Sequence, residues 1–135
     1  MNEVIRIDYT EKLKPIVEGL WVMSETDAAL EPFSWKKGTK TTPENILSKL
    51  KLPYSTPVSQ LTIDDFFMSM LTPRDWHGDA EKLTVARFQN LVVDFKTMFE
   101  TIEVFKIGEI KMPVLIVGTA KDGSIGGLKT LVVET

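Results

Sequence analysis

The sequence predicts an α/β (α+β) fold, a three-layer α/β/α sandwich built around a mainly antiparallel meander sheet. The first observation is that three strand-like segments close the chain, at residues 102–107, 111–119 and 128–134. The second is that only short, glycine-containing turns join them, and short connections imply antiparallel neighbours. The third is the continuous apolar run Val114–Val117, which is typical of a strand covered on both faces and so requires helices on each side.

Helices are expected before these strands. The first spans about Ile7–Glu18, but Pro15 removes a backbone donor, so this helix is either kinked there or begins later. Thr42 followed by Pro43 is a good helix start, because the threonine hydroxyl can cap the helix and proline costs little in the first turn. Thr62 is placed to cap a further short helix in the same way.

The longest helix is expected from Asp79 to about Phe99. Its apolar residues recur at three-and-four spacing and make one stripe, which indicates a core-facing helix and not a cofactor site. Two shorter apolar segments, residues 20–23 and 33–36, are expected to be extended. Pro32 favours an edge position for the second of them, because proline cannot donate to a neighbouring strand.

Composition indicates one globular domain over residues 1–135. The chain is 43% hydrophobic and 26% charged and has no cysteine, which excludes disulfides and thiolate metal sites. Its start lacks the basic-then-apolar run of a secretory signal, and no apolar stretch approaches the ~20 residues that cross a bilayer, so a cytoplasmic location is expected. The net charge, 16 − 19 = −3, argues against direct nucleic-acid binding and suits a partner with a basic cleft.

The sequence contains few residues suited to enzyme catalysis, and no catalytic activity is expected. His77 is the only histidine, so multi-histidine metal sites are excluded and a Ser-His-Asp triad would depend on this one residue. A small hydrolase using Asp75, His77 and Asp79 is the weakest of the alternatives. The glycine-rich stretch 123–127 precedes a strand and not a helix, so we expect a hairpin loop there and not a phosphate loop.

The last eight residues, Leu128–Thr135, alternate as a strand up to the end of the sequence. A strand that continues to the end predicts that the sheet holds Thr135 in place. Its hydroxyl and carboxylate are hard oxygen donors of the kind that Mg²⁺ accepts. The plainer interpretation, that Thr135 only ends an edge strand, stays open at this point.

Several further stretches form a recognisable pattern with this ending. They are Gly19-Leu20 with Met23-Ser24-Glu25, Leu71-Thr72-Pro73-Arg74-Asp75-Trp76, Val85-Ala86-Arg87-Phe88-Gln89-Asn90-Leu91, Val104-Phe105-Lys106-Ile107-Gly108-Glu109, Ile116-Val117-Gly118 and Val132-Val133-Glu134-Thr135. In this order and spacing they resemble the nuclease A inhibitor family of cyanobacteria. The resemblance covers most of the chain outside residues 36–60, and Arg74 is positive where the family pattern is neutral.

The resemblance implies a protein that plugs the active site of a sugar-nonspecific, Mg²⁺-dependent DNA and RNA nuclease. Carried over by position, Thr135 would coordinate the Mg²⁺ of the partner nuclease, and Glu25 would meet arginines of its cleft. Asp75 and Trp76, with Arg74 beside them, would add contacts next to the plug. The inhibitor would need no cofactor of its own and would act as a monomer in a 1:1 complex.

Alternatives stay open for single residues and for the function. Trp21 and Trp35 are expected in the core, whereas Trp76, between a proline-led turn and a glycine, is as well suited to exposure as to burial. Asp75 could equally be a helix-entry or turn-capping side chain. A non-catalytic adaptor domain on the same scaffold is the main alternative function, because fold and function can separate.

Overall fold

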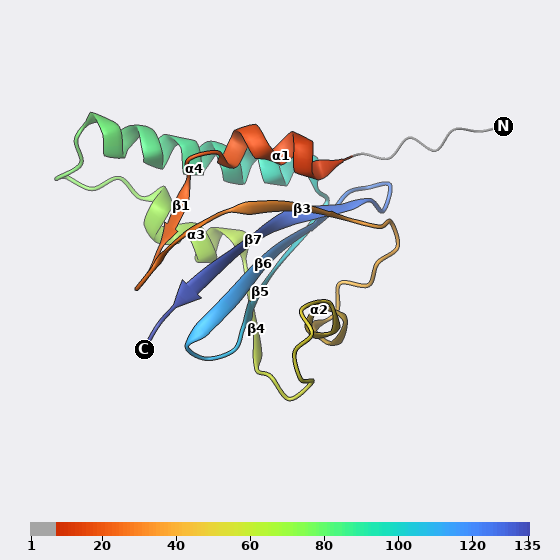
Figure 1. Ribbon diagram of the computed structural model, residues 1–135. Coiled ribbons are helices and arrows are strands. Elements are labelled where there is room, and N and C mark those ends of the chain that lie inside the picture. Colours follow the sequence, from red (N-terminus) through yellow and green to blue (C-terminus); the bar gives the residue numbers. More distant parts are fainter. Residues whose placement is uncertain (1–7) are drawn as a thin grey trace.

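The computed structural model describes residues 8–135 and contains a five-stranded antiparallel sheet with helices on both faces (Figure 1). From one edge to the other the strands are β3 (Glu31–Trp35), β7 (Ile125–Val133), β6 (Lys111–Thr119), β5 (Thr101–Ile107) and β4 (Val58–Leu61). Strands β5, β6 and β7 form the predicted meander, and β3, which contains Pro32, is an edge strand as predicted. The predicted fold class is confirmed.

A separate two-stranded sheet consists of β1 (Trp21–Met23) and β2 (Asp27–Ala29). The turn between them, residues 24–26, lies near the chain end (Figure 1). Strands β2 and β4 are not predicted by the sequence patterns above, because each is only three or four residues long and, unlike β1, contains polar residues. Short strands of this kind carry too few alternating positions to stand out from loops.

The helices are α1 (Tyr9–Val17), α2 (Pro43–Lys49), α3 (Ile63–Leu71) and α4 (Asp79–Met98). Helices α1, α3 and α4 cover one face of the sheet and α2 covers the other (Figure 1). Thr42 and Thr62 cap α2 and α3 as predicted, since their hydroxyls accept hydrogen bonds from Asn45 N and Asp65 N at 3.3 and 3.0 Å. The start of the first helix at Ile7 lies outside the described residues, and Pro15 lies inside α1.

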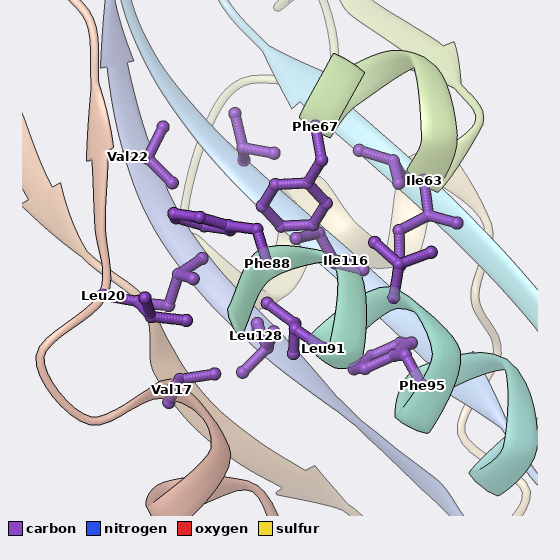
Figure 2. Close-up of a cluster of buried hydrophobic side chains, with 14 of the residues drawn as sticks. Val17, Leu20, Val22, Ile63, Phe67, Phe88, Leu91, Phe95, Ile116 and Leu128 are labelled. Carbon is purple, nitrogen blue, oxygen red and sulfur yellow. The ribbon is translucent and has the colours of Figure 1, made fainter. Parts of the chain in front are cut away.

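The larger core lies between the sheet and helices α1, α3 and α4. Phe67, Phe88, Leu91 and Phe95 project from α3 and α4 onto apolar residues of β6 and β7 (Figure 2). A smaller core lies under α2 on the other face, where the buried residues are Ile46, Leu47, Phe105, Ile107, Leu115, Val117 and Ile125. The run Val114–Val117 is buried on both faces, as its composition predicts.

The expectation that Trp21 belongs to the core is wrong, since 53% of this residue is exposed. Alternate residues of a strand face opposite sides, and in β1 the inward position belongs to Val22. Trp21 and Met23 therefore point outward. Trp35 is half-buried and stacks on Phe33, with ring centroids 4.5 Å apart.

The glycine-rich stretch after β6 is a loop only in its first part. Gly126 and Gly127 belong to β7, where they lie opposite Gly118 and Val117 of β6. A Cβ on Gly127 would come within 2.0 Å of the Ile116 carbonyl oxygen, and one on Gly126 within 2.4 Å of Tyr9. These glycines therefore let α1 and the neighbouring strands approach β7 closely.

The last strand also ends earlier than predicted, at Val133, so Glu134 and Thr135 are held by other contacts.

Among the helices of residues 8–135, none combines the length and the apolar composition required to cross a bilayer.

Candidate functional site

The end of the chain is attached to the turn between β1 and β2. The Glu25 carboxylate accepts two hydrogen bonds from Thr135: one oxygen accepts from the backbone N–H, and the other from the hydroxyl at 2.5 Å. Two donors of one residue thus meet the two oxygens of one carboxylate. Hydrogen bonds to an ionised group are stronger than neutral ones, so this pair fixes both the backbone and the side chain of Thr135.

Ser24 and the Glu25 backbone hold Val133, two residues before Thr135. The Ser24 hydroxyl accepts a hydrogen bond from Val133 N at 3.0 Å and donates one to the Thr26 carbonyl at 3.0 Å. In return the Glu25 N–H donates to the Val133 carbonyl at 3.1 Å. The turn therefore pairs with the end of β7 much as a neighbouring strand would, and this pairing places the Glu25 carboxylate.

Glu134, between these two attachments, is held from the opposite side. Its N–H donates to the Ile110 carbonyl at 3.0 Å, in the turn between β5 and β6. Its carboxylate lies 3.3 Å from Lys106 Nζ, and the two side chains form an ion pair. Each of the last three residues consequently has at least one hydrogen bond to a segment distant in sequence.

Apolar side chains surround this polar attachment. Met23, which precedes Ser24, is 75% exposed, and Ile110, whose carbonyl binds Glu134, is 54% exposed. A groove opens beside them between the β1–β2 turn, α3 and the end of β7, and Met23, Met70 and Lys106 are among its lining residues. Exposed apolar groups around fixed carboxylates are suited to contact with another macromolecule.

The candidate residues Arg74, Asp75 and Trp76 lie in the loop between α3 and α4. Two hydrogen bonds close a turn here: His77 N–H donates to the Arg74 carbonyl at 3.0 Å, and Arg74 N–H donates to His77 Nδ1 at 3.1 Å. Asp75 and Trp76 are the two central residues of this turn. Trp76 is 74% exposed and its ring packs edge-on against the His77 ring, so of the two alternatives left open by the sequence, exposure is the one that the structure has.

Asp75 makes no hydrogen bond or ion pair with any other residue between 8 and 135, which removes the support for a turn-capping role. Its carboxylate is exposed beside Trp76. His77, by contrast, has a structural role, because its ring nitrogen closes the turn.

Within the described part of the chain, no group of three or more His, Cys, Asp or Glu residues is placed to hold a metal ion.

The structure brings two of the predicted site residues together, Glu25 and Thr135. No hydrogen bond or ion pair of residues 8–135 joins them to the loop that contains Asp75 and Trp76. The loop between α3 and α4 and the chain end lie toward the same side of the view in Figure 1.

Sequence reasoning assigns no role to Ser24, Lys106 or Ile110, although all three help to hold the chain end. In the sequence, Ser24 is marked only by preceding Glu25 in a turn, and Ile110 only by following a glycine turn. Neither pattern indicates a contact with a residue more than 20 positions away.

In a comparison with protein families, a family model described as "Nuclease A inhibitor-like protein" matches residues 8–135, nearly the whole chain. A search of curated proteins found no significant match.

Proposed function

The chain belongs to the nuclease A inhibitor-like family, and from this premise we propose that it inhibits a sugar-nonspecific, Mg²⁺-dependent nuclease by occupying its active site. One observation carries the proposal: Thr135 is fixed by two hydrogen bonds to Glu25 at the rim of the sheet. The inhibitor performs no chemistry in this proposal. It forms a 1:1 complex in which the partner nuclease supplies the metal ion.

The physical basis is imitation of the substrate's charge. A cleft that binds a phosphodiester is lined by cationic groups and a metal ion, and carboxylates at fixed positions satisfy those groups without offering a bond to cut. In this proposal Thr135 contributes an α-carboxylate as well as its hydroxyl. Both are hard oxygen ligands, and Mg²⁺ prefers such ligands.

Glu25 is suited to two contacts at once. A carboxylate has about four lone-pair sites. Thr135 occupies two of them, one on each oxygen. The others remain for cationic groups of the nuclease, and arginine guanidinium is the group that binds carboxylates most specifically.

Asp75 and Trp76 supply a second contact region in this proposal, with Arg74 beside them. Tryptophan buries a large area for a small loss of side-chain entropy, and it is enriched among residues that dominate binding energy. The two-bond turn at residues 74–77 presents both side chains to solvent without a competing intramolecular partner for Asp75.

The decisive experiment compares two versions of the chain against a Mg²⁺-dependent nuclease assayed on both DNA and RNA. One version ends at Thr135 and the other carries a few additional residues after it. We expect stoichiometric inhibition by the first only, because the extension removes the α-carboxylate from its position and fills the space meant for the metal ion.

A matched control carries the same extension at the amino terminus and should inhibit normally, and the melting temperatures of all three should agree. Equal inhibition by both C-terminal forms would contradict the plug mechanism. Absence of inhibition by either form would contradict nuclease inhibition and favour the adaptor alternative, in which Thr135 has no metal to bind.

A further inference from the structure

We infer that Ser24 and Glu25 form a clamp that orients Thr135, so that Glu25 acts on the partner's metal site through Thr135 and Ser24 is a positioning residue. This inference rests on the proposed function and adds to it. The clamp is defined here as the Ser24 hydroxyl, the Glu25 backbone N–H and the Glu25 carboxylate, which together hold Val133 and Thr135.

The clamp binds the sheet at Val133 as well as binding Thr135. Ser24 Oγ and Glu25 N–H make a reciprocal pair with the backbone N–H and carbonyl of Val133, at 3.0 and 3.1 Å. Since Val133 is the last residue of β7, the Glu25 carboxylate takes its position from the sheet itself. The Ser24 hydroxyl also donates to Thr26, so its orientation within the turn is determined.

The clamp also determines which way the Thr135 side chain turns. A last residue ordinarily rotates freely about its backbone and side-chain torsions. Here the backbone N–H and the hydroxyl are bound by the two oxygens of one carboxylate, which leaves the side chain one orientation that satisfies both. Pre-organisation of this kind raises affinity because less freedom is lost on binding.

The same contact sets the chemical role of the Thr135 hydroxyl. A hydroxyl has one proton to donate and two lone pairs that accept. Its proton is directed to Glu25, so the lone pairs are the part of the group available to a cation. Glu25 thereby leaves Thr135 Oγ1 available as an oxygen ligand, and the Thr135 hydroxyl can no longer donate a hydrogen bond to the partner.

A purely direct role of Glu25, in which it only contacts arginines of the nuclease, makes a different prediction. Direct contacts of Glu25 and Thr135 would be energetically independent, and their losses would add. Action through Thr135 makes the losses non-additive, because removal of the Thr135 hydroxyl already removes one of the two groups that the Glu25 carboxylate orients.

The first test uses the free protein and needs no nuclease. Hydrogen exchange of the Thr135 amide, followed by NMR, is compared between the wild type and Glu25→Gln, which keeps the shape but leaves only one acceptor oxygen. We expect the wild-type amide to be protected and the Thr135 amide of the variant to exchange about tenfold faster, a ratio equivalent to about 1.4 kcal/mol. Ser24→Ala should lose protection at Val133 and Thr135 together.

Asp27→Asn is the matched control, because it removes the same charge from the same hairpin at an exposed side chain that has no hydrogen bond or ion pair with residues 133–135. It should leave Thr135 protection unchanged. An unprotected Thr135 amide in the wild type, or the same protection in Glu25→Gln, would overturn the clamp.

The second test is a double-mutant cycle on nuclease affinity with Glu25→Gln and Thr135→Val. We expect the affinity lost through Glu25→Gln to be about tenfold larger with Thr135 present than with Val at that position, the non-additivity expected of coupled residues. Thr135→Ser, which keeps the hydroxyl, should restore the dependence on Glu25. Additive losses would overturn the positioning role while leaving nuclease inhibition intact.

The two tests separate the inference from the proposed function. If the wild-type protein inhibits no Mg²⁺-dependent nuclease, the proposed function fails and with it the claim that Glu25 acts on a partner's metal. The exchange measurement then still decides whether Ser24 and Glu25 orient Thr135.

Discussion

At the scale of single residues, the chain end shows how ordinary surface groups acquire a defined geometry. Glu25, Thr135 and Ser24 lie at the surface, where a single polar contact contributes little because solvent competes for both partners. Four hydrogen bonds between residues 24–25 and 133–135 act together, so loss of one weakens the positions of the others. The site therefore depends on a small network and not on one strong bond.

Trp76→Ala tests the second contact region. Because Trp76 is 74% exposed, we expect the melting temperature to stay nearly constant while affinity for the nuclease falls by about 2 kcal/mol or more, as for an interface anchor. The measurement is a titration of nuclease activity alongside thermal unfolding. Tyr54→Ala is the control, since Tyr54 is also an exposed aromatic (71%) but lies in the segment between α2 and β4. Equal effects of the two substitutions would remove Trp76 from the interface.

Asp122, in the turn between β6 and β7, gives a prediction about pH. The hydrogen bond from the Ser124 hydroxyl lowers the pKa of the Asp122 carboxyl below its usual value, and the Ser124 N–H and the charge of Lys37 act in the same direction. A carboxyl with a lowered pKa in the folded state stabilises the fold at pH values above its unfolded pKa, about 3.9. That contribution is lost as pH falls through the folded-state pKa.

An NMR titration of the Asp122 side chain should therefore show a midpoint below that of an unstructured peptide. In Ser124→Ala the midpoint should move upward, because the hydroxyl donor is absent. The same midpoint in both proteins would mean that the Ser124 hydroxyl does not act on this carboxyl.

At the scale of elements, close approach to β7 determines how the layers fit. Tyr9 of α1 packs over Gly126, and Phe33 of β3 packs over Gly127, at distances that leave no room for a side chain. Arg87 of α4 adds a connection between helices, since its guanidinium donates to the Glu18 carbonyl at 2.7 Å just after α1. The β1–β2 hairpin follows directly, so the position of α1 influences where Glu25 lies.

Gly127→Ala should destabilise the protein strongly. The new Cβ would lie 2.0 Å from the Ile116 carbonyl oxygen, a backbone atom that cannot move without shifting β6. We expect a loss of about 3 kcal/mol or more in the free energy of unfolding, the upper part of the range for overpacking. Chemical denaturation measures it.

Gly78→Ala is the corresponding control, because its Cβ would meet only the flexible end of Glu81 at 3.4 Å. Gly78 occupies the N-cap of α4, so a cost below about 1 kcal/mol is expected there. A similar loss in both variants would show that close packing does not explain the glycine at position 127.

At the scale of the whole molecule, charge favours a cationic partner. The net charge is −3, and two carboxylates lie at the end of β7: Glu25, bound to Thr135, and Glu134, which Lys106 partly offsets. Complementary charge acts mainly on the rate of association, because it guides partners before contact. Short-range contacts then determine the rate of dissociation.

The association rate with a nuclease should consequently fall severalfold when salt is raised from about 0.05 to about 0.5 M, where screening shortens the reach of exposed charges. The dissociation rate should change much less. Stopped-flow measurement of both rates tests this, and thermal unfolding over the same salt range controls for effects on the fold. An association rate independent of salt would contradict guidance by the negatively charged chain end.

The sequence by itself determined the elements whose signals are local. Thr42 and Thr62 cap helices because a side-chain oxygen reaches a backbone N–H only three residues away, and α4 follows from an apolar stripe within one segment. The meander was predictable because short turns leave adjacent strands no other arrangement. The resemblance to the inhibitor family, likewise, depends on residue order and spacing alone.

Only the tertiary structure decided what depends on residues far apart in the chain. Trp21 points outward because Val22 occupies the core position of β1. Gly126 and Gly127 lie in β7 where Tyr9 and Phe33 leave no room for a side chain. The contact of Glu25 with Thr135 spans 110 residues, and no periodicity or cap connects two such positions. It exists because the β1–β2 turn and the end of β7 meet in space, which is a property of the packed layers and not of either segment.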